Sequence, residues 1–248
     1  MISRPTLMNN PMQTRRLLLP LLLSLLLLSP LSASAAIKDW LDWDRWELSG
    51  GTGTGFSKKT PLDIYHPNGD IHISDAKYDT KAWSTLAPYT DIRYTRWDDG
   101  GKTGWEAEIL HHKLFLQNKP ANVDAFAISH GYNMFTINRV WKKNDYILRA
   151  GGGFVLTHPE TIIYGTKFDA DGGGFFGFYL KGWTVQLAIE KRYPIQSGWF
   201  KGMSLFTEAK LTTSRTTIPI SDGGTAVVPN TAVHGIVGLV IPLNLFIN

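Results

Sequence analysis

The chain has 248 residues, with 25 lysines and arginines, 21 aspartates and glutamates and no cysteine. Three of the arginines and none of the acidic residues lie in residues 1–36, so without this segment the net charge falls from +4 to about +1. Binding to nucleic acid needs a basic stripe that survives in the mature protein, and this composition argues against one.

The first 36 residues predict a secretory signal peptide. Three arginines precede the apolar run 17–28, and the small residues 32–36 follow it. A membrane-spanning helix needs about 20 apolar residues, so this run is too short to cross a bilayer. A retained N-terminal anchor is the alternative. We expect residues 1–36 to be cleaved and residues 37–248 to form one domain.

The rest of the chain reads as alternating strands rich in β-branched and aromatic residues. The pattern predicts strands at 46–56, 83–97, 104–116, 124–141, 146–157, 174–191, 202–216 and 232–247. Short turns are expected at 98–103, 142–145 and 192–201, and longer connections at 57–82, 158–173 and 217–231. Short turns at one end and long loops at the other are typical of outer-membrane barrels. The sequence therefore predicts an all-β, eight-stranded antiparallel transmembrane barrel.

Charged residues lie on the strand face opposite the apolar one. They are Asp91, Arg93, Glu106, Glu108, Arg149, Glu190, Glu208 and Lys210. So many charges can be enclosed only if they pair with each other in a lumen. A secreted lipocalin-like barrel is the alternative, but its interior would be apolar. We expect a salt-bridged lumen too narrow to conduct ions.

The histidines give the sharpest indication of function, because all seven fall in the expected outer half or its loops. They are His66, His72, His111, His112, His130, His158 and His234. Histidine can bind metal, act as a base or serve as a polar rim residue. Glu108 and His112 share the lumen face, where they could form a carboxylate–imidazole pair or contribute to a metal site, which needs three or four ligands. Structural and rim roles stay open for every histidine.

Serine hydrolase chemistry is a weaker candidate. Ser129 and His130 are adjacent, so in a regular strand their side chains point to opposite faces and cannot pair. The chain has no Gly-x-Ser-x-Gly elbow.

Several short segments resemble a family of outer-membrane barrels typified by the lipid A oxidase of rhizobia. They are Gly104–Glu108, His111–Phe115, Ile128–Asn133 with Asn138, Gly151–Gly153 with His158-Pro159, and Glu208–Thr212. The resemblance implies an eight-stranded outer-membrane barrel and oxygen-dependent oxidation of the proximal glucosamine of lipid A to an aminogluconate. It singles out His111, Lys113, Gly131 and Asn133, whereas at His130 the family usually carries an acidic residue.

We therefore expect an outer-membrane protein of a Gram-negative bacterium, monomeric, with lipopolysaccharide and the membrane as its partners. The candidate catalytic residues are Glu108, His111, His112, Lys113, His130 and Asn133. The cofactor is left open between none and a divalent metal, with molecular oxygen as co-substrate if the protein is an oxidase. A non-enzymatic barrel with a structural or surface-interaction role is the main alternative, and a lipid A deacylase is the third.

Overall fold

The computed structural model describes residues 42–83, 88–170 and 172–246. The predicted signal peptide lies outside them. No helix in these ranges is long and apolar enough to cross a membrane. Apart from three short 3-10 turns, η1 (Trp43–Arg45), η2 (Ser221–Gly223) and η3 (Leu243–Phe246), the regular structure of the described residues is β-strand.

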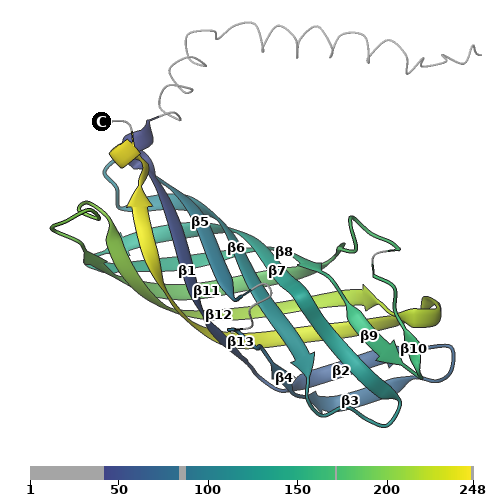
Figure 1. The fold of residues 1–248 in the computed structure, drawn as a ribbon. Helices are drawn as coiled ribbons and strands as arrows, with labels where there is room; N and C mark the ends of the chain where they lie inside the picture. Colours follow the sequence, from purple (N-terminus) through teal and green to yellow (C-terminus); the bar gives the residue numbers. More distant parts are fainter. Residues whose placement is uncertain (1–41, 84–87, 171, 247–248) are drawn as a thin grey trace, which may run out of the picture. The chain divides into compact units, whose positions relative to one another are not determined.

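Eight strands form a closed antiparallel ring (Figure 1). They are β1 (Trp46–Ser57), β5 (Thr90–Trp97), β6 (Thr103–Leu116), β7 (Val123–Lys143), β8 (Tyr146–Thr157), β11 (Tyr179–Pro194), β12 (Ser204–Pro219) and β13 (Thr225–Pro242). Each pairs with its neighbour along this order, and β13 pairs with β1 to close the ring. The predicted eight-stranded barrel is confirmed.

Strand alternation separates the two faces of the wall. Large apolar side chains point outward and are exposed on every strand of the ring, and we call them the apolar belt: Leu48, Ile92, Ile109, Ile137, Leu148, Phe154, Trp183, Val185, Leu187, Ile189, Leu205, Leu211, Val233 and Val237. Phe135, which is half-buried, completes one row of the belt, and this row runs in register across neighbouring strands as Ile92, Ile109, Phe135, Phe154 and Trp183. The alternate residues are buried inside the ring.

The end of the ring opposite the start of β1 carries structure that the sequence did not predict. The connection expected as a loop at 57–82 contains β2 (Thr60–Tyr65), β3 (Ile71–Ala76) and β4 (Tyr78–Asp79). The connection expected at 158–173 contains β9 (Glu160–Ile163) and β10 (Thr166–Lys167). The hairpin β2–β3 extends the sheet from β13, and β9–β10 extends it from β7.

Four predicted boundaries were wrong. The strand expected at 174–191 begins at Tyr179, because residues 174–178 form a turn. The segment 217–231 is no long loop, because β12 and β13 pair as far as Pro219 and Thr225 and only a tight turn joins them. The second ring strand begins at Thr90 rather than residue 83. The last strand ends at Pro242 and turns into η3, so the expected apolar ladder stops there. Proline lacks the N–H that a ladder needs, which accounts for this end.

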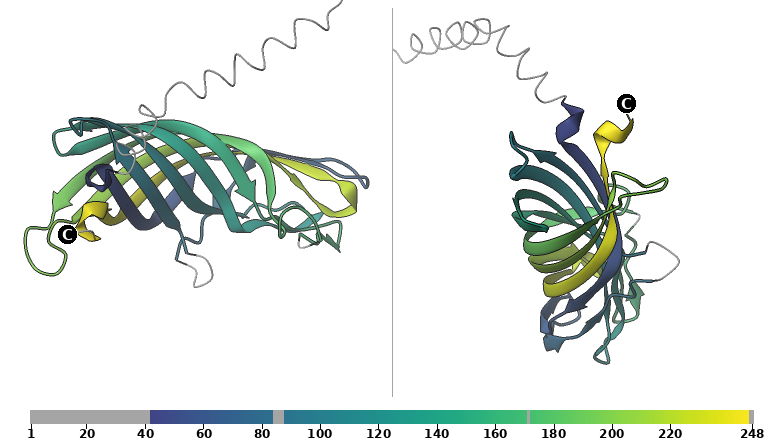
Figure 2. Two further views of the ribbon diagram at one scale, coloured as in Figure 1. Left: turned by 90° about the horizontal axis from the view of Figure 1, so that it is seen from above. Right: turned by 90° about the vertical axis from the view of Figure 1, so that its left-hand side faces the viewer.

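We call β2, β3, β9, β10 and the turn 220–224 the cap. Its hairpins touch each other, since Tyr164 Oη donates to Gly69 O at 3.1 Å and the Tyr164 ring lies 5.0 Å from that of His66. His66 Nε2 lies 3.3 Å from Asp222 Oδ2 in the β12–β13 turn. An apolar core fills the interior at this end, with residues including Leu62, Ile64, Val123, Phe126, Ile163, Ile218 and Val228. Figure 2 shows the strands of the cap continuing the barrel wall.

Candidate functional site

The middle of the barrel is filled by a network of ion pairs. Arg149 donates to Glu106 (Nε–Oε1 2.9 Å), to Glu208 (Nη1–Oε2 2.7 Å) and to Glu190 (Nη2–Oε2 2.8 Å). Arg93 also reaches Glu190 at 2.7 Å and Glu208 at 2.9 Å. All these side chains are buried, so each charge depends on its partners rather than on water. The predicted salt-bridged lumen is confirmed.

Glu108 belongs to this network and has no contact with His112. Its carboxylate pairs with Lys210 and accepts hydrogen bonds from Asn138 and Gln186. His112 is fully buried nearer the cap, and neither of its ring nitrogens has a hydrogen-bond partner in the part of the chain that the structure describes. Its ring lies 5.2 Å from that of His234. The predicted carboxylate–imidazole pair was therefore wrong: the two residues are four positions apart on β6, about 13 Å along the strand.

A large bulge in β7 builds a second constellation, on the outward face of the wall. His112 pairs with Tyr132 and Leu114 with Ile128, so Lys113 of β6 faces the three residues 129–131 of β7. Gly131 has a φ of +132°, a conformation that favours glycine. A Cβ at Gly131 would come within 2.2 Å of the Asn133 side chain. Bulges redirect side chains in this way and are frequent next to functional sites.

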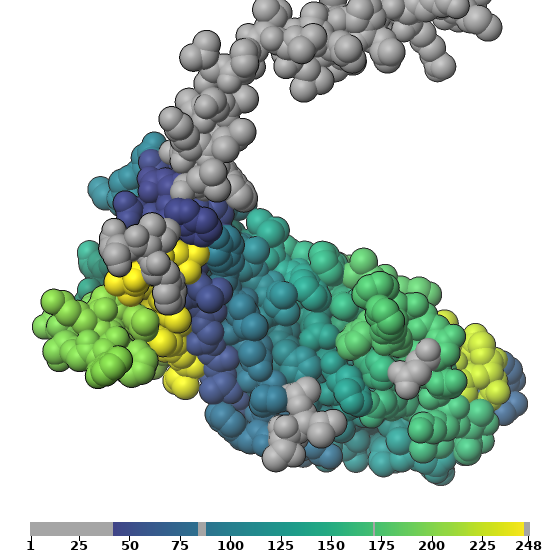
Figure 3. Space-filling model, turned by 45° about the horizontal axis from the view of Figure 1, so that its top comes forward, coloured from purple at the N-terminus to yellow at the C-terminus, as the bar shows by residue number. Residues whose placement is uncertain are grey.

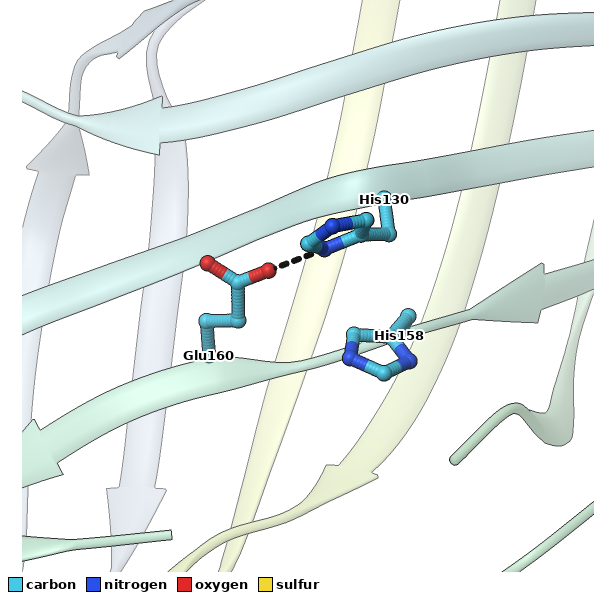
Figure 4. A group of neighbouring side chains, drawn as sticks. All are labelled: His130, His158 and Glu160. Carbon is cyan, nitrogen blue, oxygen red and sulfur yellow. Dashed lines mark hydrogen bonds and ion pairs between the residues drawn. The ribbon is translucent and has the colours of Figure 1, made fainter. Parts of the chain in front are cut away.

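The bulge brings His130 together with His158 and Glu160 (Figure 4). On the neighbouring strands, β8 ends at Thr157 opposite Tyr132, and β9 begins at Glu160 opposite Ala127. His158 thus lies beside the bulge, and its backbone N–H donates to Gly131 O at 3.3 Å. The His130 and His158 ring centroids are 5.0 Å apart, and His130 Nδ1 pairs with Glu160 Oε1. We call these three residues the outward cluster.

The outward cluster can hold a divalent transition metal. One ligand atom from each residue lies within 4.8 Å of the other two. Ligands bound to one ion at about 2.1 Å lie about 3 to 3.4 Å from each other, so small side-chain rotations would suffice. His158 Nδ1 is shielded from solvent and has no hydrogen-bond partner among the described residues, so it is available as a ligand. Two histidines and one carboxylate form the ligand set of non-haem iron oxygenases.

The other predicted residues fall around the outward cluster without joining it. His111 Nδ1 and Asn133 Oδ1 are 2.7 Å apart on adjacent strands, one step nearer the belt. Lys113 is 3% exposed, and its ammonium interacts electrostatically with Glu160. Four of the six candidates, His111, Lys113, His130 and Asn133, therefore lie at one place on the wall, whereas Glu108 and His112 lie inside the barrel.

The interpretation of Ser129 was also wrong. Because the bulge breaks the alternation of faces, Ser129 Oγ lies 3.2 Å from His130 Nδ1 and also donates to Glu160 Oε1. A Ser-His-acid relay uses the two imidazole nitrogens for different partners. Here serine and glutamate both contact Nδ1, so the geometry is not that of a hydrolase triad.

Sequence reasoning missed Glu160 entirely and left His158 outside the candidate set. The signal that could have found them is the placement of His158-Pro159-Glu160 directly after a predicted strand. Pro159 has no N–H to donate, so it interrupts the hydrogen bonds between strands at this point. From the sequence, a bend could therefore be expected there, and a bend would redirect the flanking side chains.

The outward cluster lies just beyond the apolar belt. His111 and Asn133 follow the belt residues Ile109 and Phe135 by two positions, and Lys113 and the bulge come next on the same face. Two residues of a strand span about 7 Å. On the β8 side, Leu156 and His158 continue the same face beyond Phe154. The cluster thus marks the boundary between the apolar surface and the polar end of the wall.

Comparison with known proteins adds no functional assignment. No protein-family model and no curated protein matches the chain. Two structures of Ail, the attachment invasion locus protein of Yersinia pestis, align with a TM-score of 0.40 and 10% sequence identity over 79% of this chain and 99% of theirs. One of them is in complex with the heparin analogue sucrose octasulfate. At this level the likeness says nothing about activity or partners, and the fold assignment rests on the closed ring of strand pairings.

Proposed function

We propose that this chain is an outer-membrane barrel that acts on the lipid A part of lipopolysaccharide through its outward cluster. The membrane location is supported by the distribution of polar and apolar side chains, which is the inverse of that in a soluble protein. Leu187, Ile137 and Val233 are 60%, 57% and 55% exposed on three different strands, while charged residues fill the interior. A soluble barrel would show the opposite, and a continuous exposed apolar band would drive its aggregation. The predicted signal peptide at 1–36 fits export to this membrane.

The functional proposal rests on the position of the outward cluster along the barrel axis, at the edge of the apolar belt. In a bilayer that covers the apolar belt, His130, His158 and Glu160 lie where hydrocarbon gives way to headgroups. If the cap faces the cell exterior, as long connections do in such barrels, those headgroups are the glucosamines of lipid A. The sugar would therefore reach the site from the membrane, at the outer surface of the barrel wall, and the substrate would not enter the closed lumen.

The reaction that fits is oxidation of the proximal glucosamine by molecular oxygen. The anomeric carbon and its hydroxyl give up two electrons and two protons to dioxygen, which yields a lactone and hydrogen peroxide. Hydrolysis of the lactone gives the aminogluconate, one oxygen atom heavier than the sugar. A metal held by His130, His158 and Glu160 would supply dioxygen activation. His111 and Asn133 are placed one step below, where they can bind sugar hydroxyls.

Mass spectrometry of lipid A from cells with and without the protein, grown in air, tests this proposal. We expect a gain of one oxygen atom that is lost in the His130→Ala and His158→Ala strains. His111→Ala is expected to lower the fraction of oxidised lipid A, because His111 lies beside the outward cluster. His72→Ala is the matched control, since His72 is an exposed histidine of the cap that pairs with Asp63. Loss of mass equal to a fatty acid would move the protein to the deacylases.

Metal removal provides an independent measurement. The purified barrel, stripped with a chelator, is expected to bind one ferrous or zinc ion per chain in titration calorimetry. His158→Ala should weaken this binding by at least tenfold, the usual scale for loss of a metal ligand or its support, and His72→Ala should leave it unchanged. Equal binding by all three proteins would refute the metal site.

A non-enzymatic surface barrel is the second candidate, and the cap favours it. The cap is a folded extension that shares an apolar core with the ring strands, so it offers a fixed surface beyond the membrane. On this reading, lipid A spectra are identical with and without the protein. Lipopolysaccharide still co-purifies with the barrel, and His130→Ala does not change the amount retained.

A further inference from the structure

The connection between β10 and β11 ends in a turn that presents two phenylalanines to the outside. Phe175 and Phe176 are 73% and 81% exposed, and their rings lie 4.8 Å apart. The backbones of Phe175 and Phe178 bond reciprocally, N to O at 2.9 Å and 3.0 Å. These bonds fix a two-residue turn, which we call the aromatic turn (Gly174–Phe178).

The aromatic turn holds Phe176 in an unfavourable backbone conformation. Phe176 has a φ of +50° and Gly177 a φ of +79°, the pattern of a type I′ turn. Asn, Asp or Gly normally occupies the first of these positions, and a bulky residue there is a genuine outlier. Backbone strain of this kind is unfavourable and is concentrated at functional sites such as ligand clamps. At Phe176 the strained residue is also the most exposed phenylalanine of the turn.

The aromatic turn is continuous with both the outward cluster and the apolar belt. The Phe178 ring lies 5.1 Å from the ring of His158. Two residues later, Leu180 is 58% exposed and pairs with Leu156, and Trp183 follows in the belt. In Figure 1 the connection that contains the turn projects from the side of the wall near the start of β11. Exposed aromatics thus stand at the edge of the belt, directly beside the proposed metal ligands.

We propose that the aromatic turn inserts into the outer leaflet and holds a lipid acyl chain against the wall beside His158. Burial of a phenylalanine side chain in hydrocarbon is favourable and offsets the backbone strain. Hydrocarbon is the occupant that fits, because the turn offers two apolar rings at the border of an apolar belt. An acyl chain fixed there would place its own sugar headgroup at His130, His158 and Glu160. The inference rests on the proposed membrane location.

Single cysteines test the insertion, because the natural chain has none. Phe175→Cys, Leu187→Cys and Lys167→Cys are each labelled with an environment-sensitive fluorophore and reconstituted into phosphatidylcholine vesicles. Half of the vesicles carry acyl chains brominated near the glycerol end, which quench only a label in contact with hydrocarbon. Leu187 is the belt reference, and Lys167 on β10 is the matched polar control from the same connection.

We expect the label at position 175 to be quenched at least half as strongly as that at position 187, and the label at position 167 not to be quenched. Adding Phe176→Asn keeps a residue that tolerates the turn but removes the second ring. It should lower quenching at position 175 at least twofold. Quenching at 187 alone would overturn the inserted turn while leaving the barrel in the membrane. No quenching at 187 would overturn the membrane location and, with it, the proposed function.

Discussion

Arg149 shows how much a single buried charge contributes inside this barrel. Its guanidinium contacts Glu106, Glu190 and Glu208, and none of these side chains reaches solvent. Arg149→Met leaves Glu106 without an ion-pair partner and leaves Glu190 and Glu208 with fewer cations. We therefore expect a loss of about 3 to 5 kcal/mol in the free energy of unfolding. Arg139→Met is the matched control, since Arg139 pairs with Asp98 at the partly exposed β5–β6 turn. That change should cost about 0 to 1 kcal/mol. Urea unfolding in lipid vesicles, followed by tryptophan fluorescence, measures both, and equal losses would contradict a buried network.

Gly131 is the residue on which the outward cluster depends. Gly131→Ala places a Cβ against the Asn133 side chain at a φ of +132°, so we expect the bulge to shift and His130 to leave His158 and Glu160. Metal affinity should fall by at least tenfold while the barrel still folds, because the wall strands on either side keep their pairing. Gly100→Ala is the control, with positive φ but open space around it. Metal binding equal in both variants would show that the bulge does not build the site.

The limits of sequence reasoning are clearest at these same residues. His130 was a candidate from the sequence, but its partners were not, because alternation assumes that every strand residue has one opposite it. The three residues of β7 that lie opposite the single residue Lys113 break that assumption. No local pattern reports the insertion, since it is defined by pairing with β6. Glu160 was missed for the same reason: its role follows from β9 pairing with β7.

At the scale of elements, the ring strands were predictable and the cap strands were not. The ring strands bury a polar face and expose an apolar one. Polar and apolar residues therefore alternate with a period of two along strands of 8 to 21 residues. The strands β4 and β10 have two residues each, and β2 contains Pro61, which argues against a strand when read alone. β2 and β9 form because β13 and β7 extend beyond the ring and offer free edges to pair with, β10 pairs with β9, and β4 pairs with β6.

Tyr164 joins the two hairpins of the cap, and its removal should open them. Tyr164→Ala deletes the hydrogen bond to Gly69 O and the ring contact with His66, together worth about 1 to 2 kcal/mol. Local opening of β2–β3 should become about 5 to 30 times more frequent. Tryptic cleavage after Lys77 or Lys81 in reconstituted vesicles measures this, because both lysines lie in the same connection. Tyr65→Ala, which removes a half-exposed ring from β2, is the control. Unchanged cleavage of the Tyr164 variant would mean that the hairpins hold independently.

At the scale of the molecule, the barrel interior is blocked at two positions along its axis. The ion-pair network blocks the middle of the ring, and the apolar core of the cap blocks the end opposite the start of β1. Figure 3 shows that the side chains of neighbouring strands also close the wall itself. The apolar end was not expected, because the sequence predicted only a salt-bridged lumen. An enclosed apolar core resembles the interior of a sandwich of two sheets.

Two independent seals predict that the barrel carries no current, even after one of them is removed. Wild type and a variant in which residues 60–76 are replaced by a short Gly-Ser linker are both expected to give no conductance steps in planar lipid bilayers. The linker removes β2 and β3 and opens the cap, but Arg93 and Arg149 still bridge the lumen to Glu190 and Glu208. An eight-stranded ring is just wide enough for its side chains to fill, unlike a 16-stranded porin, which serves as the positive control. Steps in the linker variant alone would show that the cap is the seal and the network is hydrated. Steps in wild type would contradict both seals and would make transport, rather than chemistry at the wall, the first function to test.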